Sequence, residues 1–274
     1  MMRLLRKRPF AMVPLPAARS EKPRRSGLTM IVDAGLPLGA QADLLELAGD
    51  YADLAKIKTG SARLYPEKIL VDKLERYRRH RVQPFLGGQF HEYVFATQGE
   101  RALGRFYSES RRLGFEAIEI SDNVVPLTRA RRKKQIRAAR AAGLAVYGEV
   151  GSKETLSDPR LLVSQAEDCF EAGAALVLVE AAELVRAGAP NRRTLDLLVR
   201  KMDLQRVMIE LPGPWIPGVR KCDVEALKKL LIEELGPDVN LANVAPEDLL
   251  DLETARVGLG VAGPPKSVSI RTGG

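Results

Sequence analysis

The sequence predicts an α/β protein built as a single (β/α)8 barrel, and two observations support this prediction. From Gly27 onward, short apolar segments alternate with helical patterns, which is typical of βαβ units and a parallel sheet. The alternation occurs eight times in the 274-residue chain, and eight βα units close a barrel of about 250 residues. A doubly wound open sheet is the alternative, but no Gly-x-Gly-x-x-Gly motif follows the first strand.

The expected strands are short apolar segments with turn residues between them and the helices. In order, they are Leu28–Asp33, Leu54–Ile57, Val82–Leu86, Ala117–Ile120, Ala145–Glu149, Leu176–Glu180, Val207–Glu210 and Val239–Leu241. A segment with helical periodicity follows each strand: Gln41–Ala48, Pro66–Arg79, Glu100–Leu113, Leu127–Ala142, Asp158–Ala172, Arg193–Lys201, Asp223–Glu234 and Pro246–Arg256. Several of these helices are followed by glycine, which readily adopts the left-handed conformation that ends a helix.

Charge and composition divide the chain into one barrel and two tails. Residues 1–26 hold eight of the 43 basic residues, one acid and four prolines, and follow neither the helical nor the strand period. We expect this basic tail to be flexible and solvated. The barrel then spans residues 27–260, with a C-terminal tail at 261–274. Because the barrel itself is nearly neutral and lacks nucleic-acid-binding motifs, nucleic acid is not an expected partner.

The remaining composition predicts a cytoplasmic protein. Cys169 and Cys222 lie outside any metal-ligand spacing, which indicates a reducing compartment and argues against a zinc site. No apolar segment approaches the roughly 20 residues of a membrane span, and prolines interrupt the apolar part of the N-terminal segment, which argues against a cleaved signal. We therefore expect no membrane partner. The sequence leaves the oligomeric state open, homo-oligomers included.

Acidic residues lie at the ends of five expected strands. The carboxyl ends of barrel strands surround one mouth, where the active sites of this fold lie. A carboxylate at the end of a buried strand is costly unless it reaches a solvated pocket, so we expect these acids to share a site. For any single acid, capping of a turn or helix is the alternative. The acids are Asp33, Glu119, Asp122, Glu149, Glu180 and Glu210, and their hard oxygen atoms suit Mg²⁺.

Lysines accompany these acids at the predicted mouth. Lys56 and Lys58 end the second strand, and Lys153 follows Glu149 in the loop Glu149-Val150-Gly151-Ser152-Lys153. A lysine near carboxylates and a metal can bind an anion or deliver a proton, whereas a surface ion pair is the alternative.

Gly87 and Gly88 end the third strand, where backbone N–H groups can approach a phosphate or carboxylate, although a plain turn has the same spacing. His91 follows them as a candidate acid or base, with simple exposure at a helix start as the alternative.

The ordered motifs resemble the phosphosulfolactate synthase family from about Gly27 to Gly260. The matching segments are Gly27-Leu28-Thr29, Asp33-Ala34-Gly35-Leu36, Gly49-Asp50-Tyr51-Ala52-Asp53 through Lys56, the Gly87-Gly88 pair with Glu92, Gly114 through Asp122, Glu149-Val150-Gly151 with Lys153, Val239 through Asn243, and Leu252-Glu253-Thr254 with Gly258-Leu259. The resemblance implies a (β/α)8 barrel that adds sulfite to phosphoenolpyruvate with Mg²⁺. The product is phosphosulfolactate, on the route to coenzyme M.

The resemblance and the strand-end pattern together give our candidate site. Lys153, the proton donor that the resemblance implies, forms the catalytic group with Glu149, Asp33 and Glu119. A small anionic carboxylate substrate is assigned to Lys56, Lys58, Gly87, Gly88, Ser121, His91 and Asn240. Mg²⁺ is assigned to Asp122, Glu180 and Glu210.

Departures from the family pattern leave the substrate open. Three of four departures remove a cation: Ala34 replaces a lysine, Glu180-Ala181-Ala182 lacks an arginine, and Gly213-Pro214 replaces Gln-Lys. Each lost charge-assisted contact is worth about 1.5–3 kcal/mol. We therefore expect a lyase that acts on phosphoenolpyruvate and sulfite or on another enolic or α,β-unsaturated carboxylate. The alternative is a non-catalytic binding or heat-stress-type protein on the same barrel.

Overall fold

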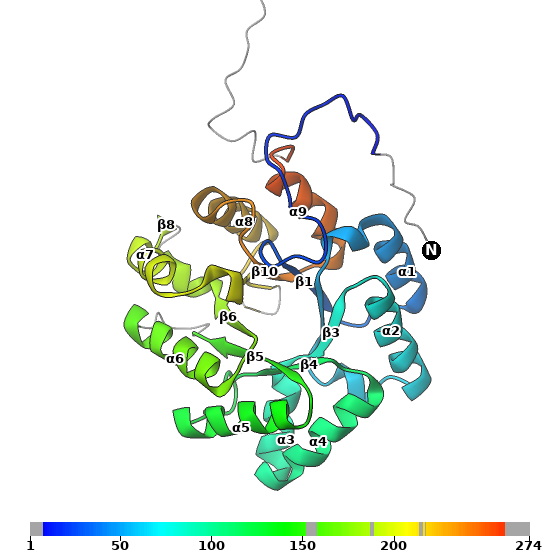
Figure 1. The fold of residues 1–274 in the computed structure, drawn as a ribbon, viewed down its shortest axis with the longest axis vertical. Coiled ribbons are helices and arrows are strands. Elements are labelled where there is room, and N and C mark those ends of the chain that lie inside the picture. The colour runs from blue at the N-terminus through cyan, green and yellow to red at the C-terminus, as the bar shows by residue number, and fades with distance from the viewer. Residues whose placement is uncertain (1–7, 152–157, 187–188, 214–215, 217, 261–274) are drawn as a thin grey trace, which may run out of the picture.

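The computed structural model describes residues 8–151, 158–186, 189–213, 216 and 218–260, and it confirms the barrel (Figure 1). Within these residues, eight parallel strands close in the order β1-β10-β9-β6-β5-β4-β3-β2. They are β1 (Thr29–Asp33), β2 (Leu54–Ile57), β3 (Gln83–Leu86), β4 (Ala117–Ile120), β5 (Ala145–Val150), β6 (Leu176–Glu180), β9 (Val207–Glu210) and β10 (Leu241–Val244). The last strand begins two residues later than expected, because pairing with β9 starts at Leu241 opposite Ile209.

Helices surround the strands in Figure 1. Those expected from the sequence are α1 (Leu38–Ala48), α2 (Glu67–Arg79), α4 (Glu100–Leu113), α5 (Arg129–Ala141), α6 (Pro159–Ala172), α7 (Arg192–Lys201), α8 (Lys221–Leu235) and α9 (Leu249–Arg256). Single 3₁₀ turns lie at Gly49–Tyr51, Ser61–Arg63, Ala181–Leu184, Leu204–Arg206 and Pro246–Asp248. Among the described residues, none of the helices is long and apolar enough to cross a membrane.

Two further features were not expected from the sequence. Helix α3 (Gly88–Gln98) begins at the second of the paired glycines, at a point where a turn was expected. Its aromatic-rich sequence lacks a clear apolar period, which explains why the pattern did not reveal it. A short antiparallel hairpin, β7 (Val185–Arg186) with β8 (Ala189–Pro190), lies between β6 and α7.

The barrel interior is filled by two successive layers of side chains. The lower layer is apolar and takes one residue from each strand: Met30, Leu54, Phe85, Ala117, Tyr147, Leu178, Met208 and Ala242. Because side chains alternate along a strand, the residue two positions further on faces the interior again. On β2, β4, β5, β6 and β9 that residue is charged: Lys56, Glu119, Glu149, Glu180 and Glu210. The carboxyl-terminal half of the interior is therefore a polar layer above an apolar floor.

The residues between those positions face outward and pack against the helices. Asp33 has this orientation, since it lies two residues beyond Ile31 of the outer core. Its Oδ2 atom accepts hydrogen bonds from Lys73 Nζ at 2.6 Å and Tyr77 Oη at 2.8 Å, both on α2. Its Oδ1 atom accepts the backbone N–H of Leu36, and the side chains of Asp33 and Lys73 are fully buried. The pair thus ties β1 to α2.

The second half of the basic tail is docked on the barrel, in contrast to the expected solvated leader. Arg19 pairs with Glu253 of α9 at 3.1 Å, and Arg24 pairs with Asp53 at 3.1 Å. Lys22 is 9% exposed and donates to the carbonyl oxygen of Gly49 at 2.8 Å. Burial lowers the pKa of Lys22 to about 8. These basic residues hold the segment across the amino-terminal end of the barrel.

We expect Lys73→Ala to lower the free energy of unfolding by about 3–5 kcal/mol, because it leaves the Asp33 carboxylate buried without its cation. Urea-induced unfolding followed by circular dichroism measures the change. Lys68→Ala is the control on the same helix, since Lys68 is 83% exposed in its ion pair with Asp72. That variant should lose less than about 1 kcal/mol. Equal losses in both variants would contradict a structural role for the Asp33–Lys73 pair.

Candidate active site

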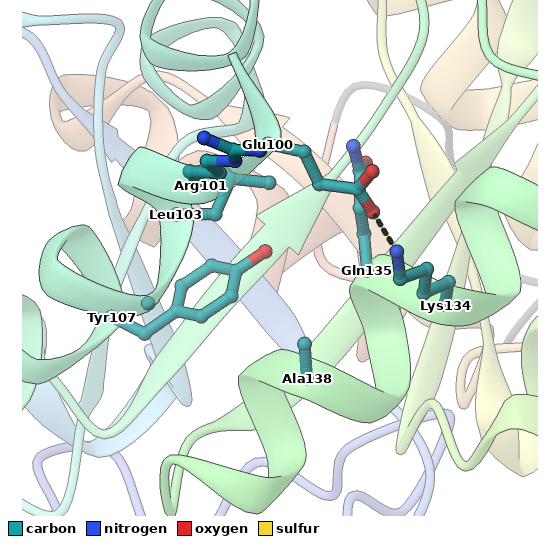
Figure 2. Close-up of a pocket in the computed structure, with 8 residues that line it drawn as sticks. Glu100, Arg101, Leu103, Tyr107, Lys134, Gln135 and Ala138 are labelled. Atoms are coloured by element: carbon teal, nitrogen blue, oxygen red, sulfur yellow. Dashed lines mark ion pairs between the residues drawn. The ribbon is translucent and has the colours of Figure 1, made fainter. Parts of the chain in front are cut away.

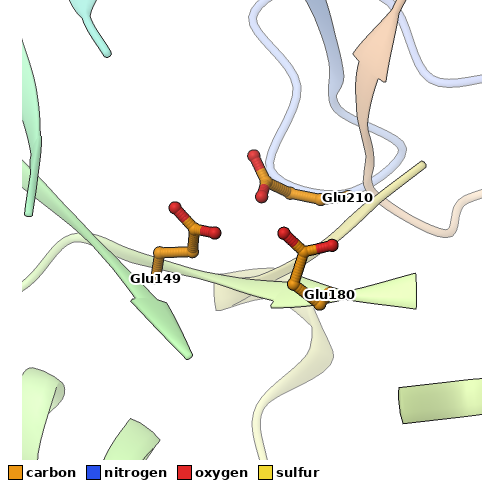
Figure 3. Close-up of side chains that lie close together, drawn as sticks. All are labelled: Glu149, Glu180 and Glu210. Atoms are coloured by element: carbon orange, nitrogen blue, oxygen red, sulfur yellow. The ribbon is translucent and has the colours of Figure 1, made fainter. Parts of the chain in front are cut away.

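Three glutamates meet inside the carboxyl-terminal end of the barrel. Glu149, Glu180 and Glu210 come from the ends of β5, β6 and β9, and each offers a carboxylate oxygen within 4.8 Å of the other two. Figure 3 shows their carboxylates pointing toward one another. All three side chains are buried. Strand register explains the meeting, because Glu180 lies directly opposite Glu210 on the neighbouring strand.

Lys56 supplies the positive charge beside this triad. Its Nζ lies 2.7 Å from Glu119 Oε2 and 3.0 Å from Glu210 Oε1. Burial alone would lower the pKa of Lys56, but Glu119, Glu210 and Glu149 outweigh this effect and raise it far above the usual range. Lys56 is therefore a fixed cation at neutral pH.

For the pKa of Glu119, burial outweighs the effect of the neighbouring lysine. Burial raises the pKa of Glu119 to about 8, Lys56 opposes the shift, and the charges of Glu149 and Glu210 add to it. Its Oε1 atom accepts the backbone N–H of Gly88 at 3.0 Å. A carboxyl group in this position can hold a proton near neutral pH, which suits it to acid–base chemistry.

The paired glycines make room for this arrangement. A Cβ atom on Gly88 would lie 2.2 Å from Ser121 Oγ and 2.8 Å from Glu119 Oε1. On Gly87 it would lie 3.3 Å from Lys56 Cε and 3.2 Å from the Ile57 carbonyl oxygen. The Gly87-Gly88 turn thus packs directly on the lysine and the glutamate of the site.

A network at the end of β4 holds Glu149 in place. Ser121 Oγ donates to Glu92 Oε1 at 2.5 Å, and Glu92 also accepts the backbone N–H groups of Asn123, Val124 and Val125. Asn123 Nδ2 in turn donates to Glu149 Oε1 at 2.8 Å. Glu92 and Asn123 were not assigned to the site from the sequence. The sequence offered a signal for Glu92, because it belongs to the same matching motif as Gly87 and Gly88. No local sequence pattern indicated Asn123.

The triad fits a divalent metal ion. Four interior glutamates face one interior lysine, and like charges so close together are costly unless protons or a cation compensate them. Carboxylate oxygens are the donors that hard divalent cations prefer. Glu149, Glu180 and Glu210 would be the ligands, so Glu149 takes the place that the sequence assigned to Asp122. The side chain of Asp122 instead forms an ion pair with Arg132 of α5.

Several predicted residues lie away from the triad. Asp33 faces α2, as described above. Asn240 accepts the N–H of Leu28 at 2.8 Å and donates to the carbonyl oxygen of Val207 at 3.0 Å, at the amino-terminal end of the strands. The amide of Asn240 thus joins the starts of neighbouring strands, at the end of the barrel opposite Glu210.

His91 also lies away from the triad. It lies between α3 and α4, where its ring stacks on Tyr107 with centroids 5.8 Å apart and its Nε2 contacts the Tyr107 hydroxyl at 2.9 Å. Burial lowers the pKa of His91 to about 4, so the ring is neutral at physiological pH. Lys58 is half-buried just beyond β2, and its N–H donates to the Asp33 carbonyl oxygen. Lys153 lies outside the described residues.

A closed barrel with carboxylates and a lysine at the carboxyl ends of its strands has the architecture of the (β/α)8 enzymes. Residues 17–261 match the family described as (2R)-phospho-3-sulfolactate synthase (ComA), and the chain belongs to that family. This confirms the resemblance seen in the sequence.

Relatives over nearly the whole chain agree with the family assignment. The chain is 30% identical over 256 residues to the phosphosulfolactate synthase of Methanothermobacter thermautotrophicus, covering 89% of this chain and 94% of the relative. It is 31% identical over 254 residues to the Bacillus subtilis phosphosulfolactate synthase, covering 88% and 93%. Protein HEAT-STRESS-ASSOCIATED 32 of Arabidopsis thaliana is 24% identical over 266 residues, covering 87% and 88%.

Solved structures are similar in fold. The 3-hexulose-6-phosphate synthase of Salmonella typhimurium superimposes with a TM-score of 0.52 at 14% identity, covering 85% of this chain and 99% of that chain. The carboxyl transferase domain of Rhizobium etli pyruvate carboxylase gives 0.53 at 11% identity, covering 82% and 41%. At these identities the similarity concerns the barrel alone.

Glu119 predicts a pH dependence of stability. In the folded protein Glu119 keeps its proton up to a pH of about 8, whereas in the unfolded chain it ionises near 4.5. Between these values the folded state holds one more proton, so its free energy of unfolding falls as pH rises, by at most about 1.4 kcal/mol per pH unit. Below about pH 6.5 the lowered pKa of His91 acts in the opposite direction, because the unfolded chain then binds a proton that the folded state does not. Urea unfolding at pH 7, 7.5 and 8 should therefore show the fall in the wild type and a flatter profile in Glu119→Gln.

The control for this measurement is Glu67→Gln. Glu67 is an exposed acid whose pKa is lowered by its hydrogen bond to Arg112, so it is ionised in both states across this range. Its variant should keep the wild-type slope. A slope in Glu119→Gln as steep as that of the wild type would disprove the raised pKa.

Proposed function

We propose that the chain is a carbon–sulfur lyase that adds sulfite to phosphoenolpyruvate, or a related nucleophile to another enolic or α,β-unsaturated carboxylate, with Mg²⁺ at the glutamate triad. The observation that carries this proposal is the buried Glu149–Glu180–Glu210 triad beside the Lys56–Glu119 pair, inside the barrel of a phosphosulfolactate synthase family member. Fold and family support a small anionic substrate held in the mouth of the barrel, and the negative charge of the triad supports the cation that would hold that substrate.

The proposed addition needs charge stabilisation and one proton. The sulfur lone pair forms a bond to the methylene carbon, and the electrons of the C=C bond move to the neighbouring carbon and its carboxylate. A proton then adds to that carbon, and no group leaves. Bound at the triad, Mg²⁺ would stabilise negative charge that builds on the substrate carboxylate.

Different residues would supply the stabilising charge and the proton. Lys56 is fixed by Glu119 and Glu210 and stays protonated, so it suits a stabilising charge better than a proton donor. Glu119 orients that lysine. The proton is assigned to Lys153, a role that rests on the family resemblance alone, since Lys153 lies outside the described residues.

A second candidate function is a binding role without catalysis. The similarity to Protein HEAT-STRESS-ASSOCIATED 32 and the loss of cations at positions such as Ala34 favour it. The intact triad and its lysine favour catalysis, because a binding protein gains nothing from burying four carboxylates around one cation.

Turnover should depend on Lys153. Purified protein incubated with phosphoenolpyruvate, sulfite and Mg²⁺ should give the sulfonate product by mass spectrometry, and Lys153→Ala should lower kcat by about 10²–10⁴-fold because general acid catalysis is lost. Lys201→Ala, at an exposed lysine of α7, is the control and should keep full activity.

Two other results would decide between the alternatives. One result is no turnover of sulfite and phosphoenolpyruvate, together with turnover of another enolic acid that is lost in Lys153→Ala. This result would support a lyase with a changed substrate. No turnover across a panel of enolic acids and nucleophiles would refute the enzyme and favour the binding protein.

Metal binding should depend on the triad. Glu180→Gln removes one ligand charge, so titration calorimetry with Mn²⁺ or Mg²⁺ should show affinity weaker by at least about tenfold. Glu247→Gln, at an exposed acid beyond β10, should bind as the wild type does. Unchanged affinity in Glu149→Gln, Glu180→Gln and Glu210→Gln would rule out the triad as the metal site.

A further inference from the structure

A cavity lies on the outside of the barrel, between α4 and α5. It encloses about 390 Å³, within the range of small-molecule sites, and Figure 2 shows its lining. Leu103 and Tyr107 line it from α4, and Gln135 and Ala138 line it from α5. None of these residues belongs to the glutamate site, so the cavity is independent of the proposed function.

Gln135 is the unusual side chain of this cavity. It is 1% exposed, yet neither its Nε2 nor its Oε1 atom has a hydrogen-bond partner among the described residues. Burial of an unpaired amide is unfavourable, and buried polar groups in folded proteins are nearly always paired. A bound molecule that pairs with both atoms would remove this cost.

The amide of Gln135 selects the kind of molecule that fits. It presents a donor and an acceptor side by side, so its complement is an edge with an acceptor beside a donor. A carboxylate only accepts and would leave Oε1 unpaired. Nucleobases have the required edge, and glutamine pairs in this bidentate way with N6 and N7 of adenine. Leu103 and Ala138 add apolar surface that suits the faces of a planar ring.

The remaining polar groups place a second part of the ligand. The Tyr107 hydroxyl points into the cavity in Figure 2 and is held by His91 Nε2 at 2.9 Å. The rim carries an ion pair between Glu100 and Lys134 at 3.0 Å, which is neutral as a unit. Arg101 also lines the cavity, is exposed, and has no ion-pair partner among the described residues. The rim therefore has one excess positive charge, which suits a phosphate.

We propose that the cavity between α4 and α5 binds a nucleoside monophosphate, with its base paired to the Gln135 amide and its phosphate at Arg101. The site is separate from the barrel mouth, so its occupation neither requires nor tests the addition of sulfite to phosphoenolpyruvate.

Titration calorimetry of the full chain with AMP, adenosine and inorganic phosphate tests the proposal. We expect saturable AMP binding with a Kd below about 1 mM. Gln135→Leu should weaken the binding of both AMP and adenosine about tenfold or more, because a bidentate contact to the base is lost. Arg101→Ala should weaken the binding of AMP and leave the binding of adenosine unchanged, because adenosine has no phosphate. Arg105→Ala, one turn further along α4 and exposed, is the matched control and should change neither.

A thermal melt without nucleotide separates binding from folding. The Gln135→Leu variant no longer buries an unpaired amide, so its melting temperature should equal or exceed that of the wild type. The same variant should bind AMP more weakly. The proposal is overturned if AMP does not saturate, if AMP and inorganic phosphate bind equally, or if Gln135→Leu binds AMP as the wild type does. It is also overturned if sedimentation shows that a second copy of the chain covers the cavity and excludes AMP.

Discussion

The polar layer of the barrel depends on the ion pairs that Lys56 makes with Glu119 and Glu210. A buried carboxylate without compensation loses its hydration and becomes protonated or destabilises the fold. Lys56 sets one positive charge among four carboxylates, which keeps part of them ionised above an apolar floor. The negative charge that remains is what would attract a cation to the triad. The stability of the fold and the proposed function therefore both require the positive charge of Lys56. The Gly87-Gly88 turn leaves the space for its side chain.

Strand alternation decides which acids share the interior. Glu149, Glu180 and Glu210 each lie two residues beyond a member of the apolar layer, whereas Asp33 lies two residues beyond the outward-facing Ile31. The sequence was sufficient to predict the strands and the acids at their ends. It could not predict the side that each acid faces, because both sides of these strands are apolar and the period of two is hidden.

Contacts between distant segments account for the other differences from the sequence-based expectations. Residues 1–26 have the composition of a flexible tail, but Arg19 and Lys22 find partners at Glu253 and Gly49, which no local pattern connects to them. The same holds for Asn240, whose amide joins strand starts, and for His91, which packs on Tyr107 rather than at the mouth. A residue type and its position after a strand indicate chemistry, whereas its partners depend on packing between whole elements.

Under the proposed function, the residues that would act on the substrate lie within strands, whereas those that would select it lie in the loops that follow them. Lys56 and the triad lie within strands, where hydrogen bonding to both neighbours fixes their positions. The departures from the family pattern at Ala34, Ala181 and Gly213 follow strand ends, where the chain is free of the sheet and a change of side chain costs the barrel little. Loss of a cation there would alter which anion the proposed site binds and would leave the charges of the polar layer unchanged. Under the proposed function, a change of substrate would therefore lie in these loops, while the strands keep Lys56 and the triad in place.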